Sequence, residues 1–135
     1  MAAKRLILRA DGASLGNPGP AAIGVVIEDE GGQVVIQISK RIGKTTNNRA
    51  EYLALIAGLE QAARLGAQEL DIRLDSQLIV RQLQGKYQSR ELSLLYQRAA
   101  DIMREFNHCN VIHVSSSDNR VAHALAHREL RKASG

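Results

Sequence analysis

Three short stretches of the sequence each place one carboxylate beside small or amide side chains. They hold Asp11 within LILRADGASLGNPG, Glu51 within TTNNRAEY, and Asp75 within LDSQL. Each acid stands where the pattern of apolar residues predicts the end of a strand or the start of a helix. Hard divalent cations such as Mg²⁺ are held by a few carboxylates together with the phosphates of a substrate. The three acids therefore predict a metal site that faces an anionic substrate.

Each acid also has a purely structural explanation. Asp11 fits a turn aspartate that accepts the amide hydrogen of Gly12, and Asp75 fits a helix cap. Glu51 fits a first-turn acid that is favoured by the helix dipole. Clustered carboxylates repel one another, however, and a bound cation removes that penalty. Three such acids with amide-rich flanks therefore favour the metal site over three separate structural explanations.

The composition predicts one small domain with a polyanionic partner. The 135 residues suffice for a single domain over 1–135, and 44% of them are hydrophobic. The formal net charge of +4 favours a partner that carries negative charge. Three Tyr, one Phe and no Trp argue against a nucleic-acid binder that depends on broad base stacking.

The cysteine count and the apolar runs predict a cytoplasmic protein outside the membrane. Cys109 is the only cysteine, so no internal disulfide can form, and a reducing compartment is the simplest setting. The N-terminal residues run straight into a strand pattern without a long apolar signal segment. No apolar run reaches the length of a membrane span.

Apolar periodicity and turn residues predict an α/β fold. We expect strands over 6–10, 22–28, 34–40, 70–74 and 111–114. We expect helices from the caps at 45–48 to Gly66, over 78–83 with Ser76 as the cap, over 91–106, and from Asp118 or Asn119 as the cap onward. Three early strands followed by βα units predict a mixed sheet with helices on its faces.

This fold brings the acids together if the first and fourth strands are parallel neighbours. Asp11 and Asp75 would then lie side by side outside the carboxyl ends of the strands, where open α/β sheets bind ligands. Glu51 lies in the first turns of the helix that must cover this edge. The small side chain of Ala50 allows a close approach.

The motifs, taken in order, resemble those of ribonuclease H of type 1. DGASLGNPGP, TTNNRAEY and LDSQL carry the resemblance, together with His113-Val114 and Asn119-x-x-Ala122-x-x-Leu125-Ala126, over nearly the whole chain. The resemblance implies a ribonuclease H-like fold, with three antiparallel strands and then βα units in a five-stranded mixed sheet flanked by helices. It also implies endonucleolytic hydrolysis of the RNA strand of RNA–DNA hybrids, which leaves 5′-phosphate and 3′-hydroxyl ends.

The resemblance further implies roles for individual residues in a monomer. Two Mg²⁺ ions, with Mn²⁺ as an alternative, would be bridged by Asp11, with Glu51 holding one ion and Asp75 contributing to the other. Contacts to the hybrid would come from Gly12, Asn17, Thr46, Asn47, Asn48, Arg49 and Gln77. A set of basic residues either contacts phosphates, which the resemblance favours, or forms a solvated face: Lys4, Arg5, Lys40, Arg41 and Lys44. Tyr87 either stacks on a sugar or packs on its own helix.

The chain departs from the family pattern at the fourth acid. His123 stands where the family has an aspartate, and Ser115-Ser116-Ser117 replaces a loop that often carries a His or Arg. His123 would then be a metal ligand, a mobile base or a helix-surface residue. It shares one helix face with His127, and the two form either a transition-metal pair or plain surface. Two functional hypotheses follow: an active enzyme, or a hybrid-binding module that cuts poorly or not at all. A third, a structural interaction domain, leaves the amide residues without a role.

Overall fold

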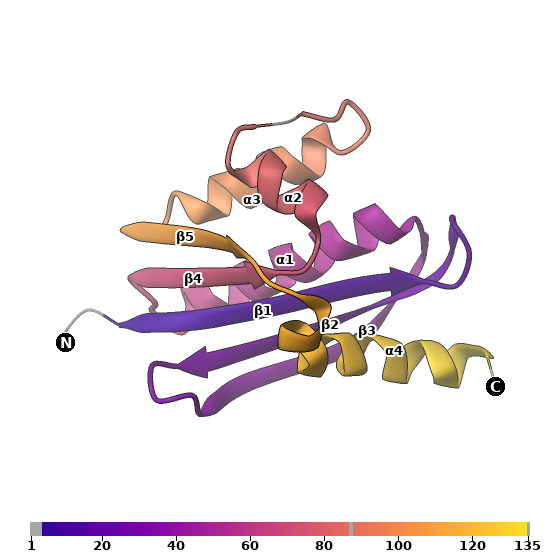
Figure 1. Ribbon diagram of the computed structural model, residues 1–135, viewed down its shortest axis with the longest axis horizontal. Coiled ribbons are helices and arrows are strands. Elements are labelled where there is room, and N and C mark those ends of the chain that lie inside the picture. The colour runs from indigo at the N-terminus through magenta and orange to yellow at the C-terminus, as the bar shows by residue number, and fades with distance from the viewer. Residues whose placement is uncertain (1–3, 87, 135) are drawn as a thin grey trace.

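The computed structural model describes residues 4–86 and 88–134, so Tyr87 lies outside the described residues. Three strands come first, and helices then alternate with the remaining strands (Figure 1). The elements are β1 (Arg5–Ser14), β2 (Gly19–Asp29), β3 (Val34–Thr45), α1 (Asn47–Arg64), β4 (Glu69–Leu74), α2 (Gln77–Leu83), α3 (Ser93–Met103), β5 (His108–His113), the 3₁₀ turn η1 (Ser116–Asn119) and α4 (Arg120–Ser134).

The strands form one five-stranded mixed sheet in the order β3-β2-β1-β4-β5. β1 pairs antiparallel with β2, β2 pairs antiparallel with β3, and β4 is parallel to both β1 and β5. The fold class predicted from the sequence is confirmed, including the central pairing of the first and fourth strands.

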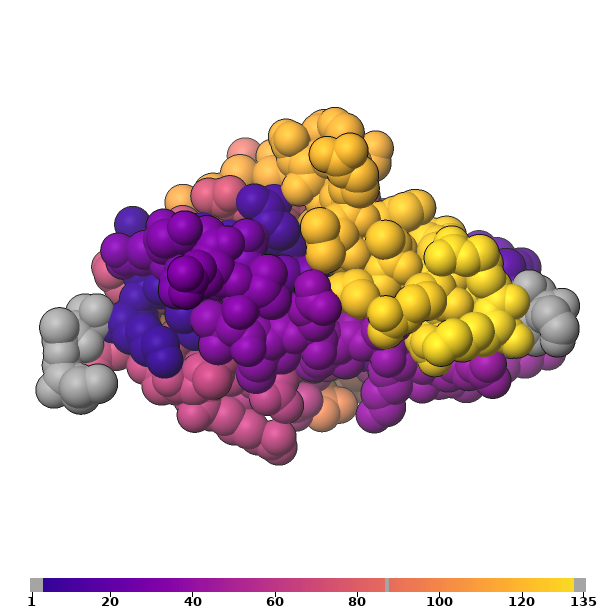
Figure 2. Space-filling view, turned by 90° about the horizontal axis from the view of Figure 1, so that it is seen from below, coloured from indigo at the N-terminus to yellow at the C-terminus, as the bar shows by residue number. Residues whose placement is uncertain are grey.

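Strand alternation divides the apolar side chains between two faces of the sheet. Leu8 of β1 and Val25 of β2 point to the face that α1 covers, in one core with buried residues of α2 and α3. Ala22 and Val26 of β2 belong to the opposite face, where α4 packs on β1, β2 and β3. Figure 2 shows α4, in yellow, lying against the purple residues of β2 and β3.

Several element ends differ from the sequence prediction. β1 continues to Ser14 instead of ending before Asp11, because antiparallel pairing with β2 goes on after parallel pairing with β4 has stopped. The connection between the first two strands, which were expected over 6–10 and 22–28, is therefore reduced to residues 15–18. The helix expected over 91–106 is shorter at both ends, and the last strand begins at His108. No helix within the described parts of the chain is long and apolar enough to cross a membrane.

Candidate active site

Asp11 and Asp75 meet where the parallel pairing of β1 and β4 ends. The last parallel pair is Ala10 with Leu74. Asp11 is the next residue of β1, and Asp75 is the first residue after β4. Asp11 still lies within β1, opposite Gly24 of β2, and only 5% of it is exposed. The sequence prediction that the two carboxylates are neighbours holds, although Asp11 stands inside a strand.

A glycine allows the third acid to approach. A Cβ on Gly12 would lie 2.2 Å from the carbonyl carbon of Ala50, so a larger residue there would push α1 away from β1. Thr46 caps α1 by accepting a hydrogen bond from the Arg49 amide, which fixes the start of the helix just before the turn that holds Glu51. The backbone contact at Gly12 therefore brings Glu51 to the edge that holds the two aspartates.

The three carboxylates form a compact, partly desolvated cluster. Asp11, Glu51 and Asp75 each offer an oxygen within 4.8 Å of the others. Burial, and then the charge of Asp75, raise the pKa of Asp11 to about 6, against the opposing effect of His123. Burial chiefly raises the pKa of Glu51 to about 7, against the hydrogen bond from Ser76. A carboxylate cluster that resists ionisation in this way fits a divalent cation. The carboxylates provide oxygen ligands for the ion, and the ion provides the positive charge that offsets their repulsion.

His123 of α4 also reaches this cluster. Its Nδ1 lies 2.9 Å from Oδ2 of Asp11, although 112 residues separate the two in the sequence. The contact depends on a second glycine, because a Cβ on Gly24 would lie 2.1 Å from the Ala122 carbonyl oxygen. α4 therefore packs on β2 at backbone distance, and this packing carries His123 to Asp11.

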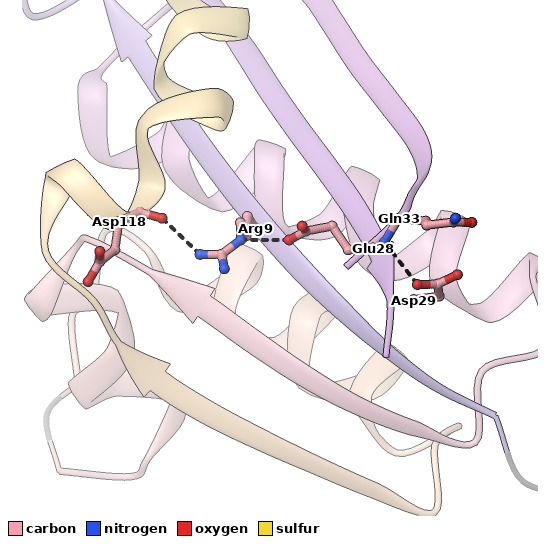
Figure 3. A network of polar contacts seen from close by, with 5 residues as sticks. All are labelled: Arg9, Glu28, Asp29, Gln33 and Asp118. Atoms are coloured by element: carbon pink, nitrogen blue, oxygen red, sulfur yellow. Dashed lines mark hydrogen bonds and ion pairs between the residues drawn. The ribbon is translucent and has the colours of Figure 1, made fainter. Parts of the chain in front are cut away.

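The turn before α4 is anchored to β1 and β2 (Figure 3). Arg9 donates to the carbonyl oxygen of Asp118 at 2.8 Å and to the carboxylate of Glu28 at 2.8 Å. The buried side chain of Asn119 donates to the Ala10 carbonyl oxygen at 2.9 Å. Asn119 stands directly before α4, as predicted, but its Oδ1 has no hydrogen-bond partner, so it anchors the turn to β1 instead of capping the helix. Ser115 caps the preceding η1 turn.

A second histidine follows one turn later on α4. The rings of His123 and His127 are stacked with centroids 4.0 Å apart. Burial lowers the pKa of His127, and the positive charge of its neighbours His123 and Arg131 adds to the effect. Asp11, His123 and His127 each offer a ligand atom within 4.8 Å of the others. Two groups of potential metal ligands therefore share Asp11.

Comparison with known proteins assigns the family. The family described as Reverse transcriptase-like matches residues 9–129. Ribonuclease HI of Halobacterium salinarum is 42% identical over 125 residues, which are 91% of this chain and 63% of that protein. The crystal structure of RNase H1 from Halobacterium salinarum is 41% identical with a TM-score of 0.92, over 95% of this chain and 98% of that one. The chain belongs to the ribonuclease H family.

A further ribonuclease H of known structure is similar to the chain over almost its full length. LC11-RNase H1, in complex with an RNA/DNA hybrid, is 39% identical with a TM-score of 0.89, over 96% of this chain and 99% of that one. The chain spans less than two thirds of the length of the curated Halobacterium relative.

The residues predicted from the ribonuclease H resemblance to touch substrate lie in two places. Asn17, Thr46, Asn47, Asn48 and Arg49 line one surface hollow together with Leu78, Ser89, Glu91 and Leu92. Asn17 accepts a hydrogen bond from the Asn47 amide at 2.9 Å, which ties the 15–18 turn to the start of α1. Gln77, at the start of α2, lines a separate hollow with Arg81, Lys86 and His113, and Gly12 is buried against Ala50.

The expected phosphate-binding cations are also spread out. Lys4 donates to the Leu65 carbonyl oxygen, and Arg5 lies 3.9 Å from Asp71, both at the end of the sheet remote from Asp11. Lys40, Arg41 and Lys44 lie on β3.

Two residues that position the site, Arg9 and Gly24, had no predicted role. Asn119 was predicted as a helix cap, but it anchors the turn before α4 to β1. Gly24 did carry a signal, because an isolated glycine within an apolar strand marks a close backbone approach. Arg9 and Asn119 are recognisable only once α4 has been placed on the sheet.

Proposed function

We propose that this ribonuclease H hydrolyses the RNA strand of RNA–DNA hybrids endonucleolytically and leaves 5′-phosphate and 3′-hydroxyl ends. One observation carries the proposal: Asp11, Glu51 and Asp75 converge from β1, α1 and the end of β4 on one edge of the sheet. The similarity to a solved ribonuclease H that holds an RNA/DNA hybrid supports the substrate class.

The three carboxylates would hold the metal ions, which we propose to be two Mg²⁺ ions with Mn²⁺ as an alternative. Asp11 is the acid that both ions would share, as the resemblance to ribonuclease H implies; it is 5% exposed and also contacts His123 of α4. Bound divalent ions would supply the polarisation of the phosphodiester and the activation of the attacking water. Asp11 and Glu51 must be ionised to act as metal ligands. Because their pKa values are raised to about 6 and about 7, both are more fully ionised at mildly alkaline pH than at acidic pH.

Recognition of the hybrid would rest on neutral amides and on the start of α1. The side-chain oxygen of Asn17 is occupied by the Asn47 amide, so its NH₂ group is oriented by the fold and available as a donor. Asn48 lines the same hollow, and amides of this kind can recognise the 2′-hydroxyl that distinguishes RNA from DNA. We assign Gly12, Asn47 and Gln77 to the same contacts with the RNA strand.

Thr46 and Arg49 would bind the DNA strand at the N-terminus of α1. The Thr46 hydroxyl accepts from the Arg49 amide, which leaves its O–H free to donate to a phosphate oxygen. The first amides of an 18-residue helix add a favourable environment for an anion.

His123 would act on the reacting phosphate or its metal ion. Its Nδ1 is held by Asp11, and half of the side chain remains exposed at 52%, so the ring borders both the cluster and the substrate side. In this position the ring can bind a proton or a cation in place of the aspartate that the family has at this position.

The five strands of the described residues form one sheet, which supports a single domain over 1–135. We propose that this domain acts as a monomer. Cys109 is a free, partly buried thiol whose pKa burial raises to about 11, so it is unreactive, and we propose a reducing cytoplasm as its setting.

A second candidate is a hybrid-binding module that cuts poorly or not at all. Two features favour it: the fourth acid is replaced by an exposed His123, and Ser115 and Ser117 bond to each other where the family often has a charged residue.

A cleavage assay on a matched panel of substrates separates the two candidates. An RNA–DNA hybrid, single-stranded RNA and duplex DNA of one sequence are incubated with the protein in Mg²⁺ or Mn²⁺, and binding is measured in parallel. The enzyme cuts the RNA of the hybrid alone and requires a divalent ion. Tight binding of the hybrid without any cut RNA in either metal would establish the binding module instead.

A further inference from the structure

Asp11 has a nitrogen-rich side as well as the carboxylate side described above. His123 and His127 are four residues apart on α4, so both rings lie on one face of the helix. His123 already touches Asp11 at 2.9 Å, and the stacked ring of His127 follows it at a centroid distance of 4.0 Å. The three side chains each offer one ligand atom, and these atoms lie within 4.8 Å of one another.

Two imidazoles and one carboxylate form a donor set that zinc and similar ions prefer. Pairs of histidines at positions i and i+4 of a helix, completed by a carboxylate, bind Zn²⁺ in many proteins. Ligand atoms on one tetrahedral ion lie about 3.4 Å apart when the metal–ligand distances are about 2.1 Å. The ligand atoms of Asp11, His123 and His127 lie at most 4.8 Å apart. The half-exposed ring of His123 can rotate to bring them to the shorter distance that an ion requires.

We propose that Asp11, His123 and His127 form a second metal site that selects a transition-metal ion such as Zn²⁺ over Mg²⁺. Mg²⁺ prefers oxygen ligands in octahedral geometry, whereas imidazole nitrogen is a good ligand for Zn²⁺ and for first-row transition-metal ions such as Ni²⁺ and Cu²⁺. The Asp11–Glu51–Asp75 group contains only oxygen donors, so the two groups differ in the ion that they select.

The position of the site gives it a specific relation to the carboxylate cluster. Asp11 belongs to both groups, and it is the only residue that they have in common. An ion between Asp11 and His123 would take the place of the hydrogen that these side chains share, and a neutral imidazole would then carry its hydrogen on the other ring nitrogen. His127 takes no part in the carboxylate group, so it is the residue whose replacement tests the second site alone.

Calorimetric titration of the metal-free protein with ZnCl₂ and, separately, with MgCl₂ tests the proposal. His127→Gln removes one nitrogen ligand from a half-buried helix position and keeps a polar side chain of similar size. The matched control is His108→Gln, which makes the same change at an exposed histidine at the start of β5. Thermal denaturation confirms that each variant is folded, and His127→Ala serves as a second replacement.

The wild type is expected to bind one Zn²⁺ at this site, and His127→Gln to weaken zinc binding by about tenfold or more, while His108→Gln leaves it unchanged. Mg²⁺ binding should be the same in all three proteins. Unchanged zinc affinity in both His127 variants, or an equal loss in His108→Gln, would overturn the proposal. Zinc binding and hybrid cleavage are measured separately, so a failure of one does not imply a failure of the other.

Discussion

Gly24 of β2 and Ala122 of α4 are in contact at backbone distance. A Cβ on Gly24 would lie 2.1 Å from the Ala122 carbonyl oxygen and 2.6 Å from the Ala126 amide nitrogen. Asp11 is the residue opposite Gly24 on β1, and His123 follows Ala122 on α4. The missing side chain of one glycine thus sets the distance between the most buried acid and the histidine that reaches it.

Gly24→Ala is expected to displace α4 and separate His123 from Asp11. A methyl group that has no space at a packed interface lowers the free energy of unfolding by about 1–3 kcal/mol. Chemical denaturation measures this loss. Gly31→Ala is the control, because its Cβ would meet only Asp29 Oδ1 at 3.4 Å; it should change stability by under about 0.5 kcal/mol. Equal stability of the two variants would contradict the close packing of α4.

The stability of the metal-free protein should fall as the pH rises. Asp11 and Glu51 have folded-state pKa values raised to about 6 and about 7. Because these carboxyls are more easily ionised in the unfolded chain, where their pKa values are roughly 4, they contribute fully to stability only below that pH. Their contribution to the free energy of unfolding is lost as the pH rises through about 6 and about 7.

Divalent metal ions should offset that loss, because they bind the ionised carboxylates. Thermal denaturation at pH 5 and pH 8, with EDTA or with Mg²⁺, measures the effect. Mg²⁺ is expected to raise Tm more at pH 8 than at pH 5, and Glu51→Gln should reduce the difference. An equal rise at both pH values would show that the cation binds elsewhere.

The sequence predicts the carboxylate cluster well because its geometry depends on local patterns. Asp75 directly follows β4, Asp11 is the first residue of β1 beyond the parallel pairing, and the Thr46 cap places Glu51 in an early turn. The contacts of α4 were not predictable in the same way. Asn119 donates to Ala10 across 109 residues, and its side chain could equally have capped a helix. Only the docking of α4 on β2 decides between these roles.

His123→Asp is expected to cleave hybrids in Mg²⁺ at least as well as the wild type, because a carboxylate is the better ligand for this ion. His123→Ala should be slower by about tenfold to a hundredfold, since the three acids remain. Cleavage rates in Mg²⁺ and in Mn²⁺ compare the three proteins. The advantage of His123→Asp should be larger in Mg²⁺, because an imidazole suits transition-metal ions better than Mg²⁺. Equal rates of all three proteins in both ions would make His123 a surface residue.

Asn48→Ala and Gln77→Ala should weaken the preference for RNA over DNA. Loss of one hydrogen bond to a 2′-hydroxyl costs about 1 kcal/mol, or roughly fivefold in affinity. Binding of the hybrid and of the matching DNA duplex is measured at several salt concentrations. Lys44→Ala is the contrasting variant, which should reduce the salt dependence by about one counterion and keep the preference. Amide variants that change only the salt dependence would reassign these residues to phosphate contacts.

The proposed function is tested by cleavage of a labelled RNA–DNA hybrid by the wild type and by Asp11→Asn, with hybrid binding measured on the same samples. Asp11 is the acid that the bound ions would share, and an amide is a poor substitute for a bridging carboxylate. The wild type is expected to give 5′-phosphate products in Mg²⁺. Asp11→Asn is expected to give none, while it still folds and binds the hybrid. Near-normal turnover by Asp11→Asn, or hybrid binding by the wild type without cleavage, would contradict the proposed function.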